Sequence, residues 1–180
     1  MYHDVMRYVA LLRGINVGGN TMIKMSELKA TFERLGFANV ATYINSGNLA
    51  FDVRKSSDAT LAAKIEKAVE KDFGKPVKVM VRPQEEIVRI LANNPFDGEY
   101  KSHKEMHVLF LNAALPNEKA KELRAIAPEG ERFAVSGREI YCHLPMGVAE
   151  SVMGRGLFER KIKVDSTARN WRTVEKLAEL

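Results

Sequence analysis

The stretch that decides the fold is Val40-Ala41-Thr42-Tyr43-Ile44-Asn45-Ser46-Gly47-Asn48-Leu49-Ala50-Phe51-Asp52-Val53. Both ends of this stretch are rich in β-branched and aromatic residues, and the four turn formers 45–48 separate them. The pattern predicts a β-hairpin in the middle of the first half of the chain.

Helical patterns lie on both sides of this hairpin. Apolar residues recur at helical spacing through residues 25–35, and again through residues 61–73, where residues 56–58 offer a helix cap. Short apolar runs at 8–12 and 77–81 have the character of buried strands. The predicted order is therefore β-α-β-β-α-β, which is the ferredoxin-like unit.

The second half repeats the order strand, helix, hairpin and helix. Its predicted elements are a strand at 106–111, a helix at 116–127, a hairpin of 132–135 with 139–144, and a C-terminal helix bearing Trp171, Val174, Leu177 and Ala178. Both hairpin turns contain Ser-Gly, at Ser46 and at Ser136. We therefore predict an α+β fold of two ferredoxin-like (βαββαβ-type) halves arranged as a duplication, with a C-terminal helix.

Three segments follow from this prediction. Residues 1–82 form the first half, residues 83–103 a helix starting at Pro83 and a linker, and residues 104–180 the second half with its terminal helix. The first half holds nine extra residues, because Leu12 and Leu111 differ by 99 in number whereas Ser46 and Ser136 differ by 90. Part of this excess falls in the loop after the first strand.

Composition places the chain among ordinary globular proteins. Of 180 residues, 46% are hydrophobic and 28% charged, and the formal net charge of +5 is scattered without a basic run. This excess fits an anionic ligand or nucleic acid, or simple solubility. A single cysteine, no apolar run of about 20 residues and no leader pattern predict a cytoplasmic protein without a membrane partner.

The loop Arg13-Gly14-Ile15-Asn16-Val17-Gly18-Gly19-Asn20, followed by Lys24, is the first candidate binding site. Its glycines do not have the spacing of a dinucleotide-binding or nucleotide-triphosphatase loop. In one interpretation, Arg13, Asn16, Asn20 and Lys24 present donors to a carboxylate, a phosphate or a polar backbone. In the other, the loop is a tight connection whose side chains bond its own backbone.

The hairpin turn is a second candidate, with Asn45, Ser46 and Asn48 as its polar residues. It can share a site with the loop only if the end of the first strand lies beside it, and we expect the two at opposite ends of the sheet. Turn chemistry alone explains these residues.

A third candidate lies at the expected start of the last helix. Arg169 and Arg172 are three residues apart and would share a helical face, where they could clamp an anion or stack on a base. Thr167 or Asn170 could cap this helix, and Trp171 is expected in the core.

No catalytic or metal-binding set stands out. His103 and His107 have helical spacing, but the segment from Met106 reads as a strand and supplies no carboxylate ligand. Cys142 and His143 are neighbours on a strand and point to opposite faces, so Cys142 is expected to be a small buried apolar group. We predict no cofactor and no metal.

Three separated segments carry a family resemblance: residues 8–19, residues 43–48, and Thr167-Ala168-Arg169-Asn170-Trp171-Arg172-Thr173-Val174-Glu175-Lys176-Leu177. Together they resemble the bacterial family called domain of unknown function 1697. The resemblance implies the same α+β fold of two ferredoxin-like halves, and it implies no activity and no catalytic residues.

The sequence thus favours a binding module for a small anion or nucleic acid. The alternatives are an enzyme of unknown reaction that acts on a polar small molecule, or an interaction protein that forms a homodimer through unpaired sheet edges.

Overall fold

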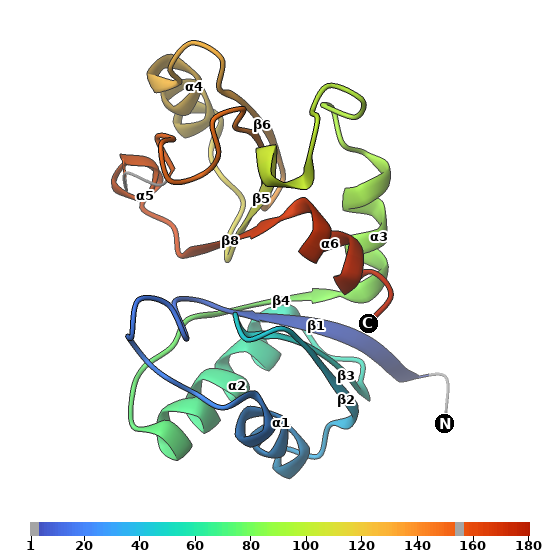
Figure 1. Ribbon diagram of the computed structural model, residues 1–180. Coiled ribbons are helices and arrows are strands. Elements are labelled where there is room, and N and C mark those ends of the chain that lie inside the picture. The colour runs from blue at the N-terminus through green and yellow to red at the C-terminus, as the bar shows by residue number, and fades with distance from the viewer. Residues whose placement is uncertain (1–3, 154–156) are drawn as a thin grey trace. The chain divides into compact units, whose positions relative to one another are not determined.

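The computed structural model describes residues 4–153 and 157–180 (Figure 1). The chain forms two units, the first up to residue 90 with residues 175–180, and the second over residues 91–174. The boundary falls once within α3 (Gln84–Ala92) and once within α6 (Trp171–Leu177). Each unit holds a four-stranded antiparallel sheet with its elements in βαββαβ order, which confirms the predicted fold.

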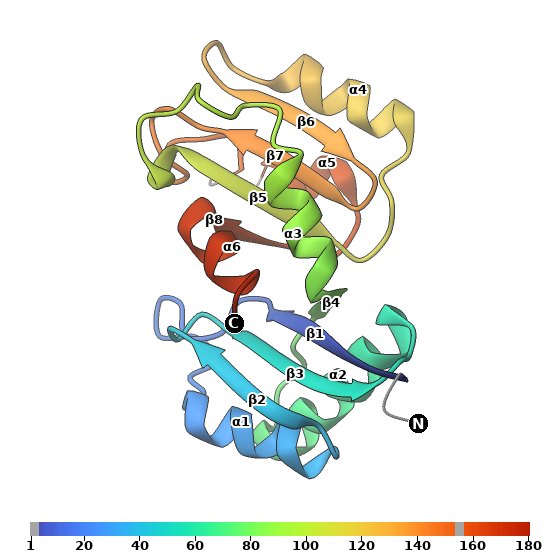
Figure 2. The same ribbon diagram turned by 90° about the vertical axis from the view of Figure 1, so that its right-hand side faces the viewer.

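The first unit contains the predicted hairpin at one side of its sheet. The strands are β1 (Val5–Leu12), β2 (Ala38–Tyr43), β3 (Asn48–Arg54) and β4 (Val79–Pro83), in the spatial order β2-β3-β1-β4. Two helices, α1 (Met25–Arg34) and α2 (Asp58–Phe73), cover one face of this sheet (Figure 2). The hydroxyl of Ser57 accepts the amide of Thr60 and caps α2, within the predicted capping segment.

Strand alternation explains the core of the first unit. Tyr8, Ala10 and Leu12 of β1 are buried with the apolar face of the helices. At the centre, the ring of Phe51 stacks on Phe37 at 4.3 Å and meets Phe32 edge-on at 5.6 Å between centroids. These aromatic pairs fix how α1 lies on the hairpin.

The second unit repeats this topology. It contains the elements β5 (Met106–Leu111), α4 (Asn117–Ile126), β6 (Arg132–Ser136), β7 (Glu139–His143), α5 (Leu157–Ile162) and β8 (Ser166–Asn170), and its sheet order is β6-β7-β5-β8. Apolar residues of α4, α5 and the sheet form one core. Helix α5 and strand β8 complete the second copy. The sequence predicted only a terminal helix after the second hairpin and did not distinguish these two elements from it.

The last segment departs from the prediction. Residues 166–170 form an edge strand rather than the start of a helix, and α6 begins only at Trp171. Asn170 does cap α6, because its Oδ1 accepts the amide of Thr173 at 3.0 Å. Pro83 likewise ends β4, and α3 begins at Gln84, one residue later than predicted.

The segment between α3 and β5, interpreted from the sequence as a linker, contributes to the second unit. Phe96 is buried, and its ring lies 6.0 Å from the ring of His143 and 4.7 Å from the guanidinium carbon of Arg132. A 3-10 turn, η2 (His103–Glu105), is closed by a capping box between Ser102 and Glu105.

The two units differ mainly in one connection. Twelve residues, 13–24, join β1 to α1, whereas five, 112–116, join β5 to α4, while α1 and α4 have ten residues each. Seven of the nine extra residues therefore fall in the loop after β1. No helix within the described part of the chain is long and apolar enough to cross a membrane.

Candidate anion-binding sites

The loop after β1 is a small β-hairpin. The amide of Asn16 donates to the carbonyl of Thr21 at 3.1 Å, and the amide of Asn20 donates to the carbonyl of Val17 at 3.0 Å. Gly18 and Gly19 have φ values of 57° and 78°, which a type I′ turn requires at its two central positions. We call residues 16–21 the finger. The geometry of its turn explains why two consecutive glycines stand at Gly18 and Gly19.

The side chain of Asn16 joins the finger to the rest of the first unit. Its Nδ2 donates to the carbonyl oxygens of Ile23 at 2.9 Å and Asn45 at 2.6 Å, and its Oδ1 accepts the amide of Ile23 at 2.7 Å. Both amide hydrogens are used within the protein. Asn16 therefore positions the loop, and no N–H of its side chain is left for a ligand.

The expectation that the hairpin turn lies far from this loop is wrong. Because β1 and β3 are antiparallel neighbours, with Leu11 opposite Asn48, the end of β1 lies beside the start of β3. The amide of Leu12 donates to the carbonyl of Gly47 at 2.9 Å. A Cβ placed on Gly47 would lie 2.8 Å from the Cβ of Leu12, so the approach requires glycine.

The polar residues of the turn serve its own geometry. Asn48 is fully buried, and its Nδ2 donates to the carbonyl of Tyr43 at 3.1 Å and to the hydroxyl of Ser46 at 2.8 Å. Asn45 is exposed and supplies the carbonyl that Asn16 binds. The turn and the loop therefore form one braced surface, and binding by these side chains stays a prediction.

A third connection reaches the same end of the sheet. The amide of Arg13 donates to the carbonyl of Lys78 at 2.9 Å, which places residues 74–78 beside the loop. We call residues 13–24, 44–47 and 74–78 the loop end. It carries Arg13, Lys24, Lys75 and Lys78 and contains no aspartate or glutamate.

The loop end also exposes large apolar side chains. Val17, Met22 and Ile44 are 60%, 68% and 56% exposed. Ile44 and Thr21 have φ values of 47° and 44°, which β-branched residues rarely adopt. This end of the first unit thus combines cations, exposed apolar groups and a constrained backbone.

Arg169 and Asn170 belong to the second unit, whereas the other predicted site residues belong to the first. The Nη1 of Arg169 donates to the hydroxyl of Thr167 at 2.7 Å and to the carbonyl of Ala168 at 2.9 Å. Arg169 lies on β8, whereas Arg172 is exposed on α6. The prediction that they share a helical face is therefore wrong.

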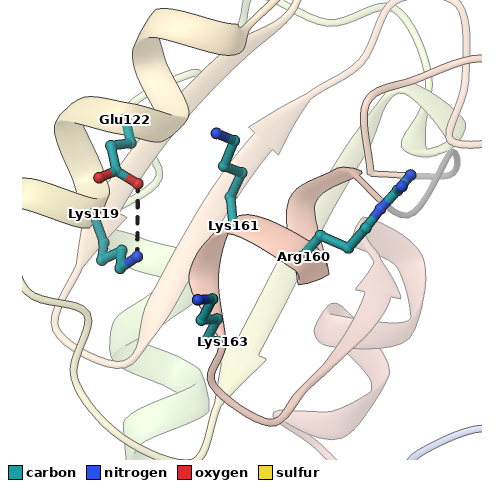
Figure 3. A pocket seen from close by; sticks show the side chains of 5 residues that line it. All are labelled: Lys119, Glu122, Arg160, Lys161 and Lys163. Atoms are coloured by element: carbon teal, nitrogen blue, oxygen red, sulfur yellow. Dashed lines mark ion pairs between the residues drawn. The ribbon is translucent and has the colours of Figure 1, made fainter.

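One cationic site was missed from the sequence. Lys119 and Glu122 of α4, Arg160 and Lys161 of α5, and Lys163 line a hollow of about 400 Å³, which we call the basic hollow (Figure 3). The near-contiguous cations at 160–163 were its only sequence signal. Lys119 joins them only through the packing of α4 beside α5.

Cross-strand pairing also brings His107 opposite Cys142. Burial, and then the charge of His103, lower the pKa of His107 from 6.5 to about 4, and its Nδ1 has no hydrogen-bond partner among the described residues. Burial, and then the charge of Glu131, raise the pKa of the Cys142 thiol. Both groups are therefore neutral at pH 7, and Cys142 is a buried apolar group as predicted.

Comparison with known proteins supports the fold. The structure of the conserved bacterial protein SP0830 from Streptococcus pneumoniae is similar with a TM-score of 0.75 and 24% identity, over 97% of this chain and 98% of that chain. At this identity the likeness shows a shared fold. No curated protein gave a significant match. Residues 5–141 match the family described as "Protein of unknown function (DUF1697)", and the chain therefore belongs to that family.

Proposed function

We propose that the protein is a binding module whose loop end takes an anionic partner, specifically the phosphate backbone of a nucleic acid. The observation that carries this proposal is the charge of the loop end, where three connections contain four cations and no carboxylate. Lysine and arginine contacts to phosphates supply most of the affinity of sequence-independent nucleic-acid binding.

The finger adds main-chain donors to these charges. Gly18 and Gly19 are exposed, and their amides donate no hydrogen bond to any described residue. Nothing lies within 4 Å of a Cβ built on either glycine, so a phosphate has space to approach the backbone. Exposed amides beside cations suit an anion with several acceptor oxygens.

The shape favours a polymer over a small molecule. Val17 on the finger and Met22 directly after it are exposed, and so is Ile44 on the neighbouring turn. Apolar side chains beside phosphate-binding cations can contact the faces of sugars and unpaired bases. Single-stranded nucleic acid presents both features along one chain.

The test is binding of fluorescent single-stranded RNA and DNA, measured by anisotropy at two salt concentrations. Lys24→Glu and Lys75→Glu, both exposed, should each weaken binding by about tenfold and flatten the salt dependence. Lys55→Glu makes the same charge change next to the end of β3, at the opposite end of the sheet, and should have little effect.

Two results would count against the proposal. Equal weakening by Lys55→Glu would show that only net charge matters. Equally tight binding of polyglutamate would assign the loop end to acidic polypeptides rather than nucleic acid.

A further inference from the structure

We propose a second, independent site in the basic hollow of the second unit, which would bind a small multivalent anion of the phosphate or pyrophosphate class. Its residues are separate from the loop end, so this inference goes beyond the proposed function.

The lining of the hollow has a strong charge imbalance. Four cations and one carboxylate give it a formal charge of +3. The carboxylate, Glu122, lies 3.7 Å from the Nζ of Lys119 one helical turn away. Neither Lys161 nor Lys163 has a carboxylate within ion-pair distance among the described residues. A bound anion would therefore neutralise ammonium groups that line the same hollow.

The fold fixes the backbone that carries these lysines. Ile162 is 2% exposed and anchors α5 in the core that it shares with Leu123 of α4. Lys161 and Lys163, its neighbours on either side, are consequently at the surface. In Figure 3, Lys161 extends from α5 toward α4, whereas Arg160 points away from the Lys119–Glu122 pair. The proposal therefore rests on Lys119, Lys161 and Lys163.

The end of α5 is also unusual. Lys163 has a φ of 52°, and its amide donates to the carbonyl of Glu159 at 3.3 Å. Glycine or asparagine commonly takes this left-handed position after a helix, so lysine here accepts a conformational cost. The left-handed conformation turns the chain at the end of α5, and the side chain of Lys163 lies on the lining of the hollow.

The size of the hollow limits the ligand. A volume of about 400 Å³ lies at the small end of the range for ligand pockets. It exceeds what one phosphate fills, and it has room for a pyrophosphate or for a phosphate attached to a small organic group. Lysine binds such groups as a point charge and needs no fixed orientation.

Titration calorimetry on the full chain tests this site, with inorganic pyrophosphate, adenosine 5′-monophosphate and adenosine as probes. Pyrophosphate should bind. If adenosine 5′-monophosphate also binds and adenosine does not, the site takes organic phosphates as well. Lys161→Gln and Lys163→Gln should each weaken pyrophosphate binding by about tenfold. Circular dichroism of both variants should stay unchanged because both side chains are exposed.

Lys121→Gln is the matched control, because Lys121 lies on α4 but lines a different hollow. It should leave the affinity within about twofold. The site is refuted if pyrophosphate does not bind, if the Lys161 and Lys163 variants bind as tightly as the native protein, or if Lys121→Gln weakens binding equally. None of these results would decide whether the loop end binds oligonucleotides, because the two sites share no residues.

Discussion

Asn16 donates a hydrogen bond of 2.6 Å from its side-chain amide to the carbonyl oxygen of Asn45, and this bond ties the finger to the hairpin turn. Asn16→Asp keeps the size of the side chain and tolerates the φ of 56°, but it removes both donors. A carboxylate would then face two carbonyl oxygens. We expect a loss of about 2 kcal/mol in the free energy of unfolding, measured by urea titration.

Asn20→Asp is the control for this change. Asn20 is exposed at the finger, and its side chain makes no hydrogen bond to a described residue, so the same charge change should have little effect. Aspartate still accepts the Ile23 amide, but the loss of both donor bonds should loosen the loop, so hydrogen exchange of that amide should become faster only in Asn16→Asp. Equal losses in the two variants would contradict a bracing role.

Gly47→Ala should be strongly destabilising. Its φ is 89°, and the new methyl group would lie 2.8 Å from the Cβ of Leu12 and 3.1 Å from the Cδ1 of Ile15. The conformational and steric costs together predict a loss of about 3 kcal/mol. Gly137→Ala changes the matching turn of the second unit, where φ is 57° and the space is open, and should cost only about 1 kcal/mol.

His107 should make the second unit less stable in acid. Its pKa is lowered to about 4 in the fold, so below pH 6.5 the unfolded chain takes up a proton that the folded chain does not. Stability therefore falls as the pH drops from 6.5 to about 4, by up to about 3 kcal/mol. His107→Gln should flatten this dependence in urea titrations that follow Trp171 fluorescence, and an unchanged slope would disprove the assignment.

Asp52 should also make the fold less stable in acid, but at a lower pH than His107. Partial burial raises its pKa, but hydrogen bonds from Asn39 and Arg7, with the charge of Arg7, outweigh burial and hold the pKa below the usual 3.8. The stability that this carboxylate contributes is present above pH 3.8 and is lost as the pH falls through the lowered pKa. Asp52→Asn should lose about 1 kcal/mol at pH 7 and progressively less below pH 3.8.

An exposed carboxylate provides the comparison for this prediction. Asp97→Asn removes a charge from an exposed side chain without an ion pair to a described residue, and should cost less free energy of unfolding at pH 7 than Asp52→Asn. If the two losses are equal, the Arg7 contact at 2.9 Å does not stabilise the fold.

The repeated topology was predictable because hairpins and amphipathic helices leave local signals. The Ser-Gly turns and the helical spacing of residues 25–35 needed no knowledge of the sheet order. The meeting of Asn16 with Asn45 did need it, because two segments 29 residues apart become neighbours only when β1 lies beside β3. Local patterns do not determine which strands pair.

Other misses have physical causes of the same kind. Strand β8 is short and polar, and Asn170 both ends it and caps α6, so its residues resembled a helix start. The basic hollow depends on α5 packing beside α4, which brings Lys119 to Lys161 across 42 positions of sequence. No pattern within one helix predicts such a contact.

The unequal connections after β1 and β5 show where this fold can change at low cost. Ile15 and Ile23, near the two ends of the connection after β1, are buried in the first core, whereas residues 17–20 between them are exposed. Shortening the connection within residues 17–20 would therefore remove a surface and leave the core intact. The finger can be treated as a replaceable part, into which new recognition sequences can be grafted between Asn16 and Thr21.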